Sequence, residues 1–281
     1  FIRSSMKKII WLDMRNILNS IEYKMVVTIY LAINLYAFIL CIKNDVGSHY
    51  QFIRSADENF ILQGTESYFL LYIMVMFFPI LSAVMCSFQK KSDDLENRSI
   101  LTIQRCGRKK YLLSKIGAIS FMTFIGTVIP LFLNLVLCHM IYPQIGYDSE
   151  WAEPKFMIGM NSYSADKFID MFRLEHSTVY NISYIFVYGI MAIGIALLAF
   201  GIAMKEKKKA HVMVKVPFLI FFLYEIFNIL LQMIGLYKII PMNYLIPGYT
   251  GSIVSFLCMI AFLLAVDVFL IRKGVCKYEI L

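Results

Sequence analysis

Charged side chains are scarce in this sequence, since Asp, Glu, Lys and Arg together make up 16% of its 281 residues. Soluble domains carry about 25% charged residues. Apolar residues reach 59%, and the mean hydropathy is +0.68. A soluble domain of this size cannot bury so many apolar side chains in one core. The composition therefore excludes an ordinary soluble protein and favours one that lies in a membrane.

The recognisable motifs of metal-dependent and nucleophilic catalysis are also missing. The four histidines are scattered, and the sequence contains no His-Glu-x-x-His, no paired-cysteine motif and no Gly-x-Ser-x-Gly. We therefore expect no catalytic residue, metal site or cofactor in this chain, and we do not expect an enzyme. The net charge of +8 does not indicate a nucleic-acid partner, because the basic residues lie between apolar runs.

Six apolar runs account for most of the chain. Each is close to or longer than the 18 residues typical of a helix that spans a membrane. The runs are apolar on all sides, whereas the strands of a membrane barrel would alternate in polarity. The sequence therefore predicts an all-α membrane protein with a six-helix transmembrane domain over residues 25–271. The predicted spans are 25–42, 68–88, 116–142, 182–204, 216–237 and 253–271.

Lysine and arginine are distributed unevenly between the connecting segments. Of the 27 basic residues, 21 lie in residues 1–24, 89–115, 205–215 and 272–281. Membrane proteins retain positive charge on the cytoplasmic side of the bilayer. This distribution predicts that both termini are cytoplasmic, that residues 272–281 form a cytoplasmic tail, and that residues 143–181 form the longest extracellular segment.

Residues 1–24 alternate apolar and polar side chains at helical spacing. Trp11 and the neighbouring Lys7 and Lys8 suit the lipid headgroup layer, where aromatic and basic side chains collect. We predict an amphipathic helix on the cytoplasmic membrane surface. A plain soluble helix would show a similar pattern, and the sequence leaves that alternative open.

The segment between the second and third predicted spans has the pattern of a short capped helix. Asp93 and Glu96 stand at capping-box spacing, and Gly107 is placed to end the helix with a positive φ. Together with the surface helix and the six spans, this segment resembles the type-2 permease family of ATP-binding-cassette transporters. The family pattern is an acidic residue, a small residue followed by apolar ones, and basic residues that lead into span three. The matching positions are Glu96, Ser99, Ile100, Leu101, Arg108 and Lys115.

The resemblance implies that residues 94–105 form a coupling helix, which docks on a separate ATPase subunit that binds ATP and Mg²⁺. Six helices form half of such a pathway, so a second copy or a homologous permease is also implied. By the same resemblance the protein is an exporter of peptide-like or amphipathic compounds in a bacterial plasma membrane, serving for example antimicrobial peptide resistance. The residues assigned to the ATPase contact are Asp94, Leu95, Glu96, Arg98, Ser99, Ile100, Leu101, Arg105 and Arg108.

The predicted fifth span carries three polar residues, Glu225, Asn228 and Gln232, at intervals that place them on one helix face. A charge in mid-membrane costs at least about 2.5–3.5 kcal/mol, so this face should meet protein or water. It either lines a transport path or makes hydrogen bonds between helices, and both readings remain open. In the sixth span, Asp267 lies five residues before Arg272, and we expect it near the cytoplasmic interface in a structural role.

The predicted fourth span has small residues at intervals of three and four, which allow close approach of helix backbones. We expect this seam to be a packing surface within the subunit. Its members are Gly189, Ala192, Ala196, Ala199 and Ala203.

A different class of function is compatible with the same spans. The chain would then be a membrane sensor or scaffold, in which the extracellular segment 143–181 binds a ligand or partner and no solute crosses. The segment is long enough for short amphipathic helices but too short for a domain of its own.

Overall fold

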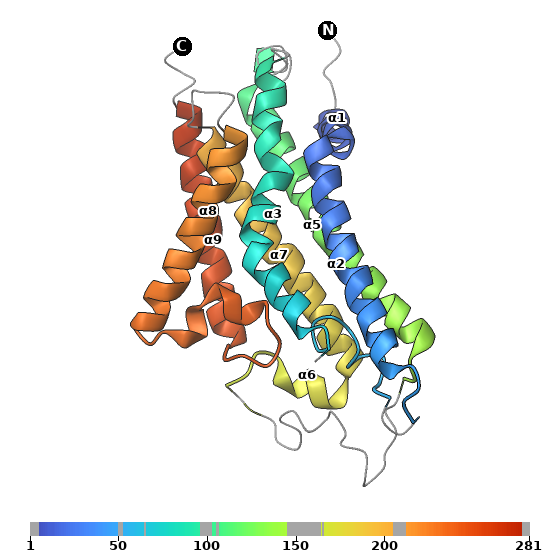
Figure 1. Cartoon of the computed structure of the whole chain (residues 1–281). Helices are drawn as coiled ribbons and strands as arrows, with labels where there is room; N and C mark the ends of the chain where they lie inside the picture. Colours follow the sequence, from blue (N-terminus) through green and yellow to red (C-terminus); the bar gives the residue numbers. More distant parts are fainter. Residues whose placement is uncertain are drawn as a thin grey trace.

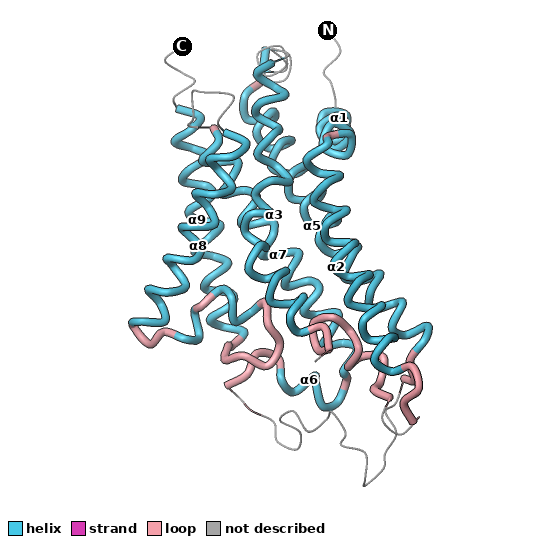
Figure 2. The backbone as a smooth tube through the Cα atoms, viewed as in Figure 1, coloured by secondary structure: helices cyan, strands magenta, loops and turns pink. Residues whose placement is uncertain are grey.

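The computed structural model describes residues 6–49, 53–64, 66–95, 103–104, 107–144, 164, 166–204 and 212–276. In these residues the backbone is mostly α-helical, with no β-strand beyond one isolated bridge. The long helices form an elongated bundle (Figures 1 and 2). The elements are α1 (Met6–Asn19), α2 (Ile21–Asp45), α3 (Tyr68–Leu95), α5 (Arg108–Ile141), α6 (Asp170–Glu175), α7 (Ser177–Ala203), α8 (Val212–Met233), η3 (Tyr237–Ile239), η4 (Pro241–Tyr244) and α9 (Ile253–Cys276).

Six helices of the described chain, α2, α3, α5, α7, α8 and α9, are long and apolar enough to cross a membrane. The predicted all-α fold with six spans is thereby confirmed. Helix α1 and the end of α9 lie at the same end of the bundle (Figure 1), as an even number of crossings requires. Most of the described loop backbone gathers at the opposite end (Figure 2). That the α1 end faces the cytoplasm stays a prediction.

A single residue separates the predicted surface helix from the first span. Ser20 has extended dihedral angles, φ −71° and ψ 143°, and its hydroxyl accepts a hydrogen bond from the backbone N–H of Tyr23. This is the geometry of a helix N-cap. The chain therefore turns at Ser20, and α1 runs in a different direction from α2 (Figure 1).

Helix α7 is the centre of the bundle. It packs against α3, α5 and α9. In its most apolar stretch of 18 residues, 72% of the residues are buried, whereas in the corresponding stretch of α9 the share is 17%. The small-residue seam lies inside, since its four alanines are at most 1% exposed and Gly189 is buried. The expectation that this seam is a packing surface within the subunit is confirmed.

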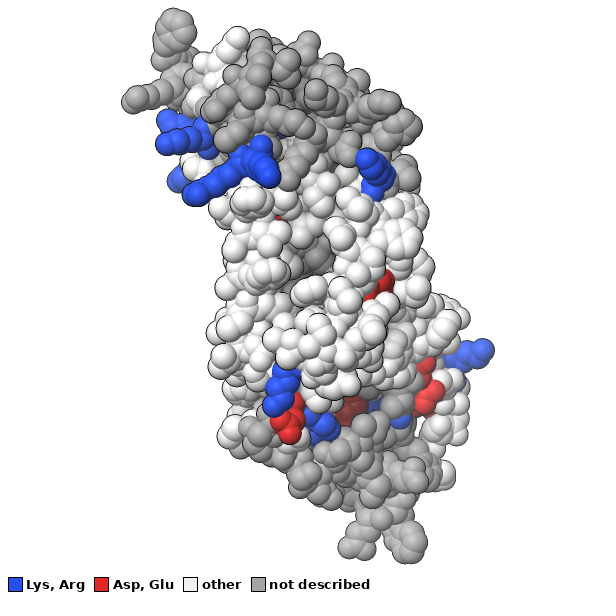
Figure 3. Space-filling model, turned by 90° about the vertical axis from the view of Figure 1, so that its left-hand side faces the viewer, with Lys and Arg blue, Asp and Glu red and all other residues white. Residues whose placement is uncertain are grey.

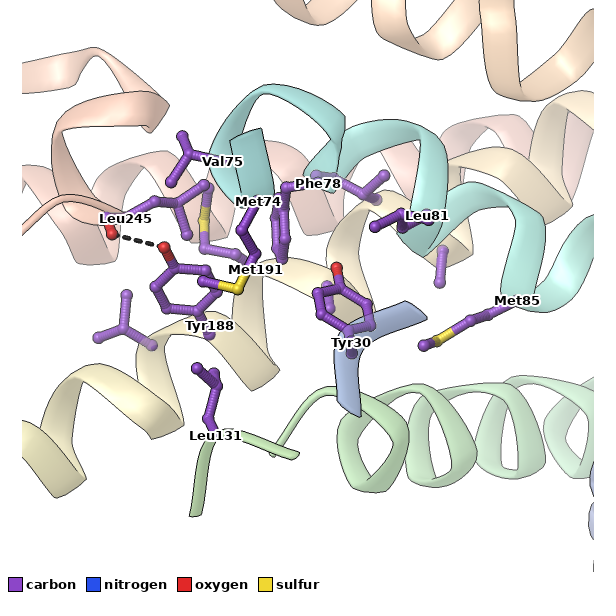
Figure 4. Close-up of a cluster of buried hydrophobic side chains, with 14 of the residues drawn as sticks. Tyr30, Met74, Val75, Phe78, Leu81, Met85, Leu131, Tyr188, Met191 and Leu245 are labelled. Carbon is purple, nitrogen blue, oxygen red and sulfur yellow. Dashed lines mark hydrogen bonds between the residues drawn. The ribbon is translucent and has the colours of Figure 1, made fainter. Parts of the chain in front are cut away.

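The core of the bundle is built from large side chains of α2, α3, α5 and α7 (Figure 4). The rings of Phe78 and Tyr188 meet edge to face, with centroids 5.5 Å apart. The Tyr188 hydroxyl donates a 2.7 Å hydrogen bond to the backbone carbonyl of Leu245. This bond fastens the chain between η4 and α9 to the core, where its non-helical backbone is shielded from lipid.

The helices begin or end up to eight residues away from the bounds of the predicted spans, and the ends of α8 and α3 show why. Helix α8 stops at Met233, four residues before the predicted end, because Gly235 takes φ +80° and the N–H of Leu236 bonds the carbonyl of Leu231. This is the Schellman pattern of helix termination. Helix α3 instead continues past the apolar run to Leu95, since no glycine or proline interrupts it there.

The contact between Gly189 and α5 gives a test of the packing. A Cβ atom at Gly189 would lie 2.5 Å from two ring carbons of Phe124. Gly189→Ala should therefore push α5 and α7 apart and lower the free energy of unfolding by about 1–3 kcal/mol. At Gly117 a Cβ would meet only Ile10, at 4.0 Å. Thermal unfolding in detergent should show a loss for Gly189→Ala and none for Gly117→Ala, and equal melting temperatures would contradict this packing.

Candidate functional site

The predicted ATPase-coupling segment is described only at its ends. Asp94 and Leu95 are the last residues of α3, so Asp93 lies inside a continuing helix and does not start a separate one. Arg108 begins α5. Gly107, just before it, has φ +81°, which confirms the predicted positive angle. The remaining predicted contact residues lie outside the described residues: Glu96, Arg98, Ser99, Ile100, Leu101 and Arg105.

A buried ion pair ties α1 to the start of α5, which follows this segment. Lys115 Nζ lies 2.8 Å from Asp13 Oδ1, with side chains only 3% and 8% exposed. The Ser114 hydroxyl donates to the other Asp13 oxygen at 3.3 Å. Asp13 lies between Ile9 and Ile17 on the buried face of α1. The basic residue that leads into span three is thus an anchor for α1.

The three polar residues of α8 do not share one environment. Asn228 is 6% exposed, and neither of its amide atoms has a hydrogen-bond partner among the described residues. Glu225 is half-buried, and Gln232 is exposed. Along α8, the polar side chains therefore pass from the bundle interior at Asn228 to its surface at Gln232. One half-buried carboxyl group is therefore left at the edge of an apolar helix.

Helices α8 and α9 present the most open surface of the bundle. Only 28% of the residues in the apolar stretch of α8, and 17% of those in α9, are buried in the bundle. The view from this side (Figure 3) shows a broad band of uncharged residues with an acidic group within it. On this face the described charges at the α1 end are Lys and Arg, whereas both signs occur at the opposite end (Figure 3).

At the end away from α1, a carboxylate from a loop is held over the start of α7. Asp57 is 3% exposed. It accepts hydrogen bonds from Ser177 Oγ at 2.6 Å, Thr178 Oγ1 at 2.8 Å and Asn181 Nδ2 at 3.0 Å. His139 Nε2 of α5 lies 3.6 Å away. A negative charge at this place also interacts favourably with the helix dipole of α7. We call these five residues the Asp57 cluster.

The loop that carries Asp57, residues 53–64, is packed into the bundle without being helical. Ala56, Phe60 and Ile61 are fully buried. The N–H of Ile61 donates to Asn134 Oδ1 at 3.2 Å, and Asn134 Nδ2 donates to the carbonyl of Asn34 at 2.7 Å. Buried backbone groups outside helices need such partners in a membrane protein. The polar residues of α5 and α7 at this end therefore hold the loop in place.

Two charged groups of this loop are shifted by their surroundings. Burial raises the pKa of the Glu58 carboxyl, although hydrogen bonds from the Ser55 N–H and hydroxyl oppose the shift. Burial also lowers the pKa of the Arg54 guanidinium, against the attraction of Glu66 and Glu58. Desolvation is the first cause for both groups. The loop is thus held by burial of its apolar residues and by the Asp57 bonds more than by ion pairs.

The fold and these polar sites define a multi-pass membrane protein with six spanning helices. Comparison with protein-family models, with curated proteins and with solved structures finds no match to this chain. In the described residues no group of three or more His, Cys, Asp and Glu side chains is arranged to hold a metal ion.

Proposed function

We propose that this chain is the permease subunit of an ATP-binding-cassette transporter, driven by a separate ATPase. The observation that carries the proposal is the position of Glu225. Its carboxyl group lies in the middle of a spanning helix and is only half covered by its own bundle. Because lipid is a costly neighbour for such a group, protein or water must lie opposite it. A transport path between two permease copies supplies both.

The surface around Glu225 supports a second permease copy. Most of the apolar residues of α8 and α9 are not buried by the rest of the chain. Six helices from each of two copies would enclose a path that one copy leaves open on this side. Glu225 and Gln232 would then face that path, while Asn228 remains inside the bundle. A partly charged lining favours amphipathic or peptide-like solutes over purely apolar ones.

The α1 end is the place where we propose that the ATPase docks. Helix α3 ends and α5 begins at that end, on either side of the predicted coupling segment, and the Asp13–Lys115 ion pair joins α5 to α1. Movement of the docked segment would pass to α5 and α1 together. On the face that Figure 3 shows, the described charged residues at the α1 end are Lys and Arg. This is consistent with a cytoplasmic position of that end.

Co-purification tests the proposal. The chain is co-expressed with the ATPases encoded beside its gene, extracted in mild detergent and compared with Leu95→Asp and Glu96→Arg. We expect an ATPase to co-purify with the wild-type chain and to be lost from both variants. Lys43→Ala, at an exposed position at the end of α2 away from α1, is the control that should keep the ATPase. If no ATPase binds the wild-type chain, the transporter is rejected, and segment 143–181 becomes the site to test for ligands.

A further inference from the structure

Asp267 of α9 is a carboxyl group that is buried among helices and has no partner among the described residues. The residue is 1% exposed. In the part of the chain that the structure describes, neither carboxyl oxygen has a hydrogen-bond partner, and no ion pair includes Asp267. Buried carboxyl groups in proteins are normally paired or hydrogen-bonded. That Asp267 lies near the cytoplasmic interface stays a prediction, and the structure adds that its side chain is buried inside the bundle.

The helix that faces Asp267 offers no polar group to meet it. Intervals of four and three residues separate Leu263, Asp267 and Leu270, so these side chains lie on one face of α9. Leu263 lies against Gly194 of α7, and Leu270 against Gly201. Asp267 therefore faces the turns of α7 between these two glycines. Residues 190–203 of α7 contain no ionisable side chain.

The other elements near α9 place their charges elsewhere. In η3 the only charged residue is Lys238, at the far end of α9, where its Nζ lies 2.7 Å from Asp166. On α9 itself, Arg272 and Lys273 follow toward the α1 end, and Lys273 Nζ lies over the Phe269 ring. Helix α8 carries Lys215 and Glu225 but packs mainly against α3 and α7.

We propose that Asp267 is a proton-binding site, held protonated by the α7–α9 contact and ionised only when the two helices part. An ionised carboxylate in this apolar contact would lose its hydration without gaining a donor or a cation. The proton is the ligand that fits, because a metal cation needs several oxygen ligands and this contact supplies leucines and glycines. Packing of α9 against α7 is therefore linked to proton uptake and release. This inference does not rest on the proposed function.

Infrared spectroscopy of the purified chain in lipid nanodiscs tests the protonation directly. A protonated carboxylic acid has a carbonyl stretch that is separate from the bands of carboxylate and amide groups. At neutral pH we expect this band in the wild-type protein, its loss in Asp267→Asn, and its persistence in Glu225→Gln, which removes the other acidic residue of α8 and α9. An unchanged band in Asp267→Asn, or no such band in the wild type, overturns the proposal.

The linkage has a second readout that does not depend on assigning a band. As the pH rises from about 5 toward 8, the melting temperature of the wild type should fall more than that of Asp267→Asn, because the wild type holds a proton in the folded state that the unfolded carboxyl has already released at these pH values. Asp267→Leu, which matches its neighbours Leu263 and Leu270, should lose the same pH-dependent component and serves if the Asn variant does not fold. Equal pH dependence in the wild type and the variant overturns the linkage.

Discussion

Replacing Lys115 by methionine is expected to lower the free energy of unfolding by about 3–5 kcal/mol, because it removes a buried counter-charge that lies against the buried Asp13 carboxylate. The methionine keeps most of the length and the apolar part of the side chain, so the loss reports the charge. The pair closes at 2.8 Å with both side chains almost fully buried. Thermal or denaturant unfolding in detergent, monitored by circular dichroism, measures the change.

The matched control is Lys110→Met, at an exposed position on the same helix. It should change the stability by less than about 0.5 kcal/mol. Combining Lys115→Met with Asp13→Leu removes both charges and should restore most of the loss, because two apolar side chains leave no buried ion. If Lys115→Met behaves like Lys110→Met, the ion pair does not hold α1 to α5.

Asp57→Ala is expected to cause a loss of similar size, about 3–5 kcal/mol. Three donors at the start of α7 would lose a charged acceptor, and hydrogen bonds to charged groups are each worth about 1.5–3 kcal/mol. The loop 53–64 should also loosen, which limited proteolysis of the folded protein would detect as faster cleavage near Arg54. Asp57→Asn keeps one oxygen acceptor and should lose about half as much.

Asp166 provides the comparison for this prediction, since it is also an aspartate at the end of the bundle away from α1. Its carboxyl lies 2.7 Å from Lys238 Nζ, but the two side chains are 70% and 54% exposed. The Lys238 ammonium lowers the pKa of Asp166, yet pairs exposed to solvent contribute little. Asp166→Asn should leave both the melting temperature and the proteolysis rate almost unchanged. A loss as large as that of Asp57→Ala would mean that burial does not distinguish the two sites.

The spanning helices could be predicted from sequence because lipid imposes one requirement on all of them. A run of apolar residues long enough to cross the hydrocarbon core must satisfy its backbone internally, and a helix does so. Helix ends depend on local chemistry that hydropathy does not contain. The apolar run of α8 continues to Tyr237, but Gly235 stops the helix by taking a positive φ. Helix α3 keeps its geometry beyond its apolar run because polar residues such as Lys90 and Lys91 are compatible with it.

The polar sites were less accessible to sequence analysis because their members are far apart in the chain. Asp13 and Lys115 each have a plausible separate role, as part of a surface helix and as a basic residue before span three. Only the fold brings α1 against α5. The sequence around Asp57 does not mark it as a site. Asn134 and His139 inside the predicted third span, with Asn181 just before the predicted fourth, do indicate polar groups at that end.

The burial of the polar residues in α8 and α9 depends on which side of each helix faces its neighbours. Spacing puts Glu225, Asn228 and Gln232 within one broad face, but it does not decide where the rim of that face meets the neighbouring helices. Packing of α8 against α3 and α7 covers Asn228 and leaves Gln232 outside. For Asp267, distance along the chain from Arg272 gives the depth in the membrane, whereas burial is decided by the side on which α7 lies.

Native mass spectrometry of the complex purified through this chain would weigh the proposed transporter as a whole. We expect an assembly with two permease chains, this one twice or this one with a homologue, and two ATPase chains. Release from detergent in the presence of Mg²⁺ and a slowly hydrolysed ATP analogue should preserve that mass. A single 32.6 kDa chain with no ATPase, or a dimer that never carries one, would contradict it.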